Sequence, residues 1–421
     1  MKRLAIFSAG LIFLLSSAFL SCSELPIGQI ATNKTPPSPL TNVDITPTYG
    51  GAYVTYTLPN EQDISYVKCE FTYNGKKRTV RSSIYKNHLE IDGLGDPEEI
   101  ELKICVVNHS EVESKPHIEK FIPLEPPVSF ILNSFRVEPS FGGIKIHWEN
   151  PTRIMAGISF LAADDNGVLE LKDMVFSSLP TGTKSLRGFN TDLRTFAMSI
   201  TDKYENEYDT VKFQVEPFYE VMIDKSLFKR VPLTGDNMTT HDNRPIEKIW
   251  DGIYFGGHYD IWHTIADAVA NQGLNNPQTF TIDLGVMAQL SRVVVYNRSG
   301  DNDMYAYDQH NLRRFDVWGT DQPMYTGVQG NYETSTNPYY SDNSWKADWK
   351  LLAECEVIKP SGSPRGTNTP EDIAAHYAGF EFEFTQDVPK VRYIRFVVNE
   401  TWSRTAALHI CEIDVFGDDR E

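Results

Sequence analysis

Residues 280–285 read Phe-Thr-Ile-Asp-Leu-Gly, and residues 380–384 read Phe-Glu-Phe-Glu-Phe. Apolar and polar side chains alternate in both stretches, and a period of two with one apolar face predicts half-buried antiparallel strands. The aromatic content of 12% and the shortage of long helical patterns favour the same class. The sequence therefore predicts an all-β chain.

A repeat organises the first half of the chain. Residues 47–59 align without a gap on residues 139–151, at an offset of 92 residues. In each copy a Gly-Gly pair predicts a tight turn, and the strand after it should point alternate side chains into a core. These inward side chains are Val54 and Tyr56 in the first copy and Ile146 and Trp148 in the second. The spacing equals one immunoglobulin-like domain, so we expect two tandem sandwiches.

The N-terminus has the pattern of a secretory signal. A basic start is followed by an apolar run over residues 4–20, which is short for a membrane-spanning helix. The junction at residues 19–22 looks like a bacterial lipobox, which would make Cys22 the acylated first residue of the mature chain. Ordinary secretion or an uncleaved anchor are the alternatives. The Pro-rich residues 22–40 predict an extended tether.

Composition and linkers complete the predicted organisation. The formal charge of -18 carries no basic block, which argues against nucleic acid and anionic lipid as partners and leaves neutral glycans or proteins. Pro-rich residues 123–127 and the polar residues 234–244 read as linkers. The predicted units are a signal peptide at 1–21, a tether at 22–40, two sandwiches at 41–127 and 128–232, and a C-terminal domain at 233–421.

The C-terminal segments resemble a known family. Trp250-Asp251-Gly252 leading to Trp262-His263-Thr264, the strand-like residues 391–396, and residues 410–417 are similar to the coagulation factor five/eight type C, or discoidin-like and galactose-binding-like, domain. This resemblance implies a jelly-roll β-sandwich whose loops bind ligands, with Trp262 in the core. The two repeats in turn resemble fibronectin type III domains.

The discoidin resemblance also implies a structural calcium ion. The matching positions are Asp251 and Glu412, and calcium takes six to eight oxygen ligands that these two and backbone carbonyls could begin to supply. The loop after Asp251 is longer than the family's usual turn and lacks its next polar ligand. The alternative is that Asp251 only forms a turn and Glu412 only makes hydrogen bonds at the edge of the core.

Sugar recognition requires flat apolar faces beside fixed hydrogen-bonding groups. The loops at the expected binding end supply six candidate ligand-binding residues, together with Tyr305, Tyr307 and His310. The candidates are Trp402, Arg298, His258, Tyr259, Asn297 and Arg404. The alternatives are that Arg298 only braces its loop by hydrogen bonds and that Trp402 packs beneath its loop.

The cysteines leave two alternatives. Cys69–Cys105 and Cys355–Cys411 are possible disulfides in an oxidising compartment, or all four are buried free thiols. Their spacing to histidine does not resemble a zinc site.

The sequence contains no nucleophile elbow, zinc-protease motif, phosphate loop or dinucleotide fingerprint, so we expect a non-catalytic protein. It resembles lipid-anchored accessory proteins of glycan-utilisation systems in Bacteroidetes-type bacteria, held at the outer membrane on its outer or periplasmic face. The leading prediction is carbohydrate binding by the C-terminal domain. The alternative is an adhesin or structural subunit that binds a transporter or enzyme through an aromatic patch. Its residues would be Tyr305, Tyr307, Tyr325, Tyr339 and Tyr340.

Overall fold

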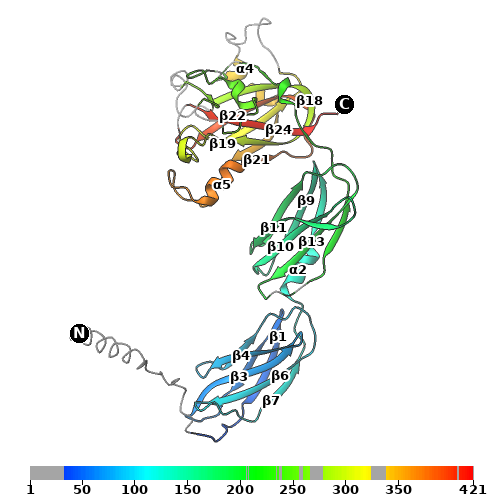
Figure 1. Ribbon diagram of the computed structural model, residues 1–421, viewed down its shortest axis with the longest axis vertical. Helices are drawn as coiled ribbons and strands as arrows, with labels where there is room; N and C mark the ends of the chain where they lie inside the picture. The colour runs from blue at the N-terminus through cyan, green and yellow to red at the C-terminus, as the bar shows by residue number, and fades with distance from the viewer. Residues whose placement is uncertain are drawn as a thin grey trace, which may run out of the picture.

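The computed structural model describes residues 33–204, 206, 208–233, 235–236, 239–255, 259–265, 278–323, 338–404 and 407–420. Within these residues three β-structured units follow one another end to end (Figure 1). Strands form their cores and the helices are short, so the predicted all-β class is confirmed. No helix in the described ranges is both long enough and apolar enough to cross a membrane. Cys22 and the signal segment lie outside these ranges.

The first unit is a sandwich of two antiparallel sheets, with strand orders β1-β2-β5 and β4-β3-β6-β7. Alternate side chains of both sheets meet in one core, where Val54 is fully buried and Tyr56 is 4% exposed. The strands are β1 (Thr41–Thr48), β2 (Gly51–Thr57), β3 (Ile64–Tyr73), β4 (Lys76–Ser83), β5 (His88–Ile91), β6 (Ile100–Asn108) and β7 (His117–Phe121).

The second unit repeats this arrangement, with sheet orders β12-β9-β8 and β11-β10-β13-β14. Ile146 and Trp148 on β9 enter its core as predicted. Helix α2 (Pro127–Ser134) adds Val128 and Ile131 to the same core. The strands are β8 (Arg136–Ser140), β9 (Gly143–Glu149), β10 (Ala156–Ala163), β11 (Leu169–Ser177), β12 (Thr181–Arg187), β13 (Arg194–Asp202) and β14 (Val211–Val215).

Each glycine of the repeated Gly-Gly pair has its own physical reason. Gly50 and Gly142 have φ values of 66° and 64°, in the left-handed region that side chains disfavour. At Gly51 a Cβ would lie 1.9 Å from the Ile91 carbonyl oxygen, and at Gly143 it would lie 1.8 Å from the Leu186 carbonyl oxygen. The turn therefore needs one glycine for its conformation and the next for close strand approach.

The C-terminal unit is built around β18 (Gln278–Tyr296). The first part of this strand pairs with β22 (Val391–Thr401), and its last part pairs with β24 (Glu412–Asp418) and β21 (Phe380–Glu383). The remaining strands are β15 (Val221–Met222), β16 (Lys229–Arg230), β17 (Trp262–His263), β19 (Leu312–Thr320), β20 (Lys350–Glu356) and β23 (His409–Ile410). The helices are η2 (Lys225–Leu227), η3 (Ile246–Trp250), η4 (Asp301–Asp303), α4 (Pro338–Ser341), η6 (Ser344–Ala347) and α5 (Pro370–Ala378).

The core of this unit confirms part of the predicted pattern. Phe280, Ile282 and Leu284 are fully buried, as is Trp262. The opposite face of the strand is not open to solvent as predicted, because Thr281 is also fully buried. Val231, Leu233 and Asp236 cover that face, and Asp236 forms a buried ion pair of 2.9 Å with Arg395.

Two further features differ from expectation, and the four cysteines take one of their two predicted alternatives, buried free thiols. Trp250 ends the 3-10 helix η3 and does not start a strand. Strands β15 and β16 precede residue 233 yet pair with β24 and β18, because the connecting segment extends the C-terminal sheets. The cysteines that might have formed disulfides are free and buried. On paired strands Cys69 lies opposite Ile104 while Lys68 lies opposite Cys105, so the two thiols face opposite sides of the sheet.

Candidate functional site

A pocket of about 300 Å³ opens beside the loop that follows β18. That loop supplies six of the ten lining residues, and the others come from the segment before β17, from α5 and from the residue between β23 and β24. The lining residues are Phe255, Ile261, Arg298, Ser299, Gly300, Asp301, Met304, Tyr305, Tyr377 and Cys411. One sugar ring would fill a space of this size.

Arg298 is the charged centre of this pocket. Its guanidinium carbon lies 4.1 Å from the centre of the Tyr305 ring, and the residue is only 5% exposed. The Arg298 backbone N–H donates to Asn311 Oδ1 at 3.1 Å, and Asn311 Nδ2 donates back to the Arg298 carbonyl at 2.8 Å. These bonds fix the loop, so the guanidinium is held in place before any ligand arrives.

The facing wall is aromatic. The rings of Phe255 and Tyr377 lie 4.7 Å apart, and Tyr377 donates a hydrogen bond of 2.6 Å to Asp303 Oδ1. Asp301 adds an exposed carboxylate to the lining. The pocket thus combines apolar ring faces, a guanidinium donor and a carboxylate acceptor, the set of groups that recognises the C–H face and hydroxyls of a sugar.

A group of histidines lies next to this pocket. His263, His310 and His409 bring ring nitrogens within 4.8 Å of one another, and the ring of Tyr305 lies 6.1 Å from that of His409. His241 packs on His263 with the ring centres 4.6 Å apart. Strands β17 and β23 pair directly, which sets His263 opposite His409.

Burial keeps the imidazoles of His263, His310 and His409 neutral at pH 7 by lowering their pKa values. It lowers the pKa of His263 to about 3, with repulsion from His241, His310, Arg244 and Arg298 acting in the same direction. Burial likewise lowers the pKa of His310 and of His409.

The hydrogen bond to Arg244 fixes the tautomer of His263. Arg244 Nη1 lies 2.8 Å from His263 Nδ1, and because a guanidinium only donates, Nδ1 must accept. The proton of the neutral ring is then on Nε2, which leaves no lone pair there for a metal ion. In this arrangement the Nε2–H group of His263 is a hydrogen-bond donor.

The predicted site residues fall into different environments. Of the six ligand-binding candidates, Arg298 is the one within the described residues that lines the pocket, and the neighbouring Tyr305 lines it too. Asn297 is buried and exchanges hydrogen bonds of 3.0 and 3.1 Å with the backbone of Leu312, so it braces the loop. Trp402 packs against the core and lies 5.3 Å from the Tyr307 ring. Trp402 is the first candidate for a sugar platform; its half-buried ring takes part in the packing of the core, and the platform role stays a prediction.

The remaining ligand-binding candidates within the described residues do not line the pocket. Arg404 is 80% exposed and its Nε bonds Glu400 at 3.2 Å. Tyr259 is 61% exposed with the guanidinium of Arg244 at 5.1 Å from its ring centre. His258 lies outside the described residues. Sequence reasoning missed His263 and His409, because only the pairing of β17 with β23 brings them together.

The fold separates the tyrosines that the alternative prediction placed in one aromatic patch. Tyr307 and Tyr340 are buried at 1% and 6% exposure, and Tyr325 lies outside the described residues. Tyr305 and Tyr339 are half-buried. The described members therefore do not make one exposed surface.

The predicted calcium residues already have cationic partners. Asp251 accepts from Lys248 Nζ at 2.9 Å, and Glu412 accepts from Lys225 Nζ at 2.5 Å. Glu412 is fully buried, and burial raises the pKa of its carboxyl group while Lys225 opposes that rise.

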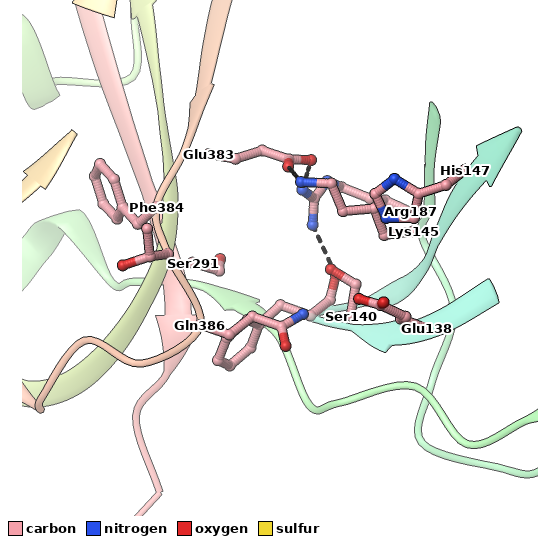
Figure 2. Close-up of a pocket in the computed structure, with 11 residues that line it drawn as sticks. Glu138, Ser140, Lys145, His147, Arg187, Ser291, Glu383, Phe384 and Gln386 are labelled. Carbon is pink, nitrogen blue, oxygen red and sulfur yellow. Dashed lines mark hydrogen bonds and ion pairs between the residues drawn. The ribbon is translucent and has the colours of Figure 1, made fainter. Parts of the chain in front are cut away.

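A second pocket of about 300 Å³ lies where the second and C-terminal units meet. Figure 2 shows Glu383 of β21 reaching toward Lys145 and Arg187 of the second unit. The carboxylate lies 2.9 Å from Lys145 Nζ, and Gln386 donates to the Pro139 carbonyl at 3.1 Å. Because its charged groups are paired across the boundary, we interpret this pocket as part of a joint between the two units.

Three families of unknown function match successive parts of the chain. DUF4959 matches residues 37–123, DUF5126 matches residues 124–226 and DUF5000 matches residues 250–417, and each is described as a domain of unknown function. No curated protein matches the sequence.

Several solved structures resemble parts of the chain. A SusE-like protein is 27% identical, with a TM-score of 0.42, over 69% of this chain and 98% of that one. The C-terminal domain of a chitobiase from Bacteroides fragilis is 12% identical, with a TM-score of 0.29, over 48% of this chain and 100% of that one. A CBM32 domain of a GH31 protein bound to GalNAc is 14% identical, with a TM-score of 0.27, over 45% of this chain and 95% of that one.

Proposed function

We propose that this chain is a non-catalytic, lipid-anchored protein of the bacterial outer membrane that binds carbohydrate at the Arg298 pocket. It would serve a glycan-utilisation system as an accessory binder. The observation that carries the proposal is the fixed stack of Arg298 on Tyr305 at 4.1 Å, facing the Phe255 and Tyr377 rings across a space of sugar size. The two sandwiches and the predicted tether would hold this site away from the membrane.

The proposal predicts how a sugar would be held. Tyr377 and Phe255 would contact its C–H face, while Arg298 would donate to ring hydroxyls and Asp301 would accept from them. A shallow site with one charged donor gives weak affinity for a single sugar. Repeated units of a polymer would raise the apparent affinity by multivalency.

The test is a glycan-panel binding assay followed by calorimetry on the mature chain. Arg298→Ala should weaken binding about 10-fold or more, because a charged hydrogen bond contributes about 1.5 to 3 kcal/mol. Arg404→Ala is the matched control, since it removes an exposed guanidinium of the same domain and should leave affinity unchanged. Full affinity in the Arg298 variant would move the site elsewhere, and failure of the wild type to bind any glycan would refute the function.

A protein partner, such as an outer-membrane transporter or enzyme, is the second candidate. The observation that favours it is β11, an edge strand of the second sandwich. Its Leu171 and Phe176 are 56% and 71% exposed, and unpaired edges with apolar side chains are common sites of protein docking. Phe176→Glu should abolish co-purification of a partner and leave glycan binding intact, while retained co-purification would contradict this candidate.

A further inference from the structure

We infer that the ammonium group of Lys225 occupies the position expected for a divalent cation in the C-terminal unit, so that this unit folds without calcium. The inference concerns the stability of the unit and does not depend on glycan binding. It rests on four carboxylates and two lysine ammonium groups, and on the way the chain places them.

Two buried carboxylates create the need for a cation. Glu412 and Asp414 are separated by one residue on β24, so both side chains lie on the same face of the strand. Their side chains are 0% and 6% exposed. Two carboxylates held this close and away from water require a positive partner.

Lys225 supplies that positive partner with all its hydrogen-bonding capacity. Its Nζ lies 2.5 Å from Glu412 Oε1, contacts Asp414 Oδ1 and lies 3.1 Å from the Tyr254 hydroxyl. An ammonium group has three protons, and these three acceptors use them all. Tyr254 in turn donates to Asp414 Oδ1 at 2.7 Å, which closes the network.

The backbone fixes Lys225 in this position. Just before it, Val221 and Met222 of β15 pair with Gly417 and Phe416 of β24, and the Ile223 N–H donates to the Val415 carbonyl at 2.8 Å. Lys225 then begins the 3-10 helix η2, whose cap Asp224 accepts from the Ser226 N–H. The lysine therefore belongs to a paired segment and not to a free loop.

The other predicted calcium ligand is also occupied. Asp251 accepts from Lys248 Nζ at 2.9 Å and from the Ile253 N–H at 3.0 Å, and the same ammonium lies 3.2 Å from Asp260. Calcium needs six to eight oxygen ligands, and two ammonium groups beside them would repel a dication. The residues present do not fit the calcium site that the family resemblance implies.

Neutralisation of Glu412 and Asp414 by a lysine, in place of a metal ion, has a structural consequence. A metal ion would stabilise only the unit that binds it, whereas Lys225 lies on the segment that arrives from the second sandwich. The same contact thus neutralises β24 and attaches the connecting segment to it. A chelator has no access to a cation that is part of the chain.

The first experiment follows thermal unfolding of the mature chain in EDTA and in millimolar calcium, with calorimetric titration of calcium. We expect the melting temperature to stay within about 1 °C across these conditions and the titration to show no saturable heat. A wild-type melting temperature that falls in EDTA and recovers with calcium would overturn the inference.

The second experiment removes the ammonium. Lys225→Ala leaves two buried carboxylates unpaired, so the melting temperature should fall by about 10 °C and calcium should restore part of the loss. Lys390→Ala is the control, because its exposed ammonium donates to the Arg420 carbonyl and to neither predicted calcium ligand, so its removal should produce no calcium response. A Lys225→Ala variant that folds but gains no response to calcium would show that Lys225 does not fill a cation position. If this variant does not fold, the wild-type chelator experiment still decides.

Discussion

Replacement of Glu383 by glutamine should loosen the joint between the second sandwich and the C-terminal unit. Glu383 lies on β21, while all three of its partners, Lys145, Ser185 and Arg187, belong to the second sandwich. Figure 2 shows Lys145 and Arg187 converging on Glu383 across the boundary. The substitution keeps the shape of the side chain but removes the charge that attracts two cations, so it tests the electrostatic part of the contact.

The pKa of Glu383 sets the expected magnitude. Burial raises this pKa, but the hydrogen bonds from Ser185 and Lys145 and the charge of Arg187 outweigh burial and hold it at about 2, below the usual 4.5. That difference corresponds to about 3 kcal/mol. The side chain is 31% exposed, so solvent screening reduces the contribution to roughly 1.5 kcal/mol.

The direction of the pH dependence follows from the lowered pKa. A carboxylate whose pKa is lower in the docked state stabilises that state fully above its ordinary value. The stabilisation should therefore be complete above about pH 5 and should disappear as the pH falls toward 2. The Glu383→Gln variant should lack this dependence.

Small-angle scattering at pH 7 measures the outcome. We expect a larger spread of interdomain distances for Glu383→Gln than for the wild type, with little change in the melting of each unit. Glu356→Gln is the control, because Glu356 pairs with Arg313 and Arg314 inside the C-terminal unit. Identical scattering of wild type and Glu383→Gln would refute the reasoning.

Three other predictions concern the stability of the chain and the burial of its thiols. Gly143→Ala places a Cβ 1.8 Å from the Leu186 carbonyl oxygen, so the free energy of unfolding should fall by about 3 kcal/mol in denaturant titrations. Burial raises the pKa of Cys69 to about 12 and that of Cys411 to about 11. Both thiols should therefore react with a disulfide reagent at pH 8 only after the chain unfolds. Rapid reaction of the native chain would contradict this. Trp402→Ala should lower the stability of the C-terminal unit by about 3 kcal/mol, measured by denaturant titration, because the ring packs on the core; an unchanged unfolding midpoint would contradict that role.

Local patterns in the sequence were sufficient for the strands and for the repeat. The alternation around Phe280 and the Gly-Gly pairs each depend on neighbours within a few residues, and the structure confirms the buried face and the turns. Burial of the second face could not be predicted, because the covering residues Val231, Leu233 and Asp236 lie where the sequence predicts only the end of the second sandwich and the start of a linker.

The candidate site was only partly predictable for a similar reason. Arg298 stands out as a charged residue in a loop, but its meeting with Phe255 and Tyr377 depends on tertiary packing. The family resemblance pointed to Glu412 as a metal ligand and gave no sign of Lys225, because that lysine lies 187 positions away in the chain. Contacts of such long separation carry no periodic pattern in the sequence.

The long strand β18 has a consequence for how the C-terminal unit opens. Residues 278–288 pair with β22, and residues 289–296 pair with β24, so the strand is shared by both sheets. Separation of one sheet would disrupt the strand that the other needs, and the unit should therefore unfold as a single cooperative foldon. The loop that carries Arg298 begins directly after this strand, at Asn297. Its amide protons near Arg298 should thus exchange with solvent about as slowly as those of the core, an unusual property for a binding loop.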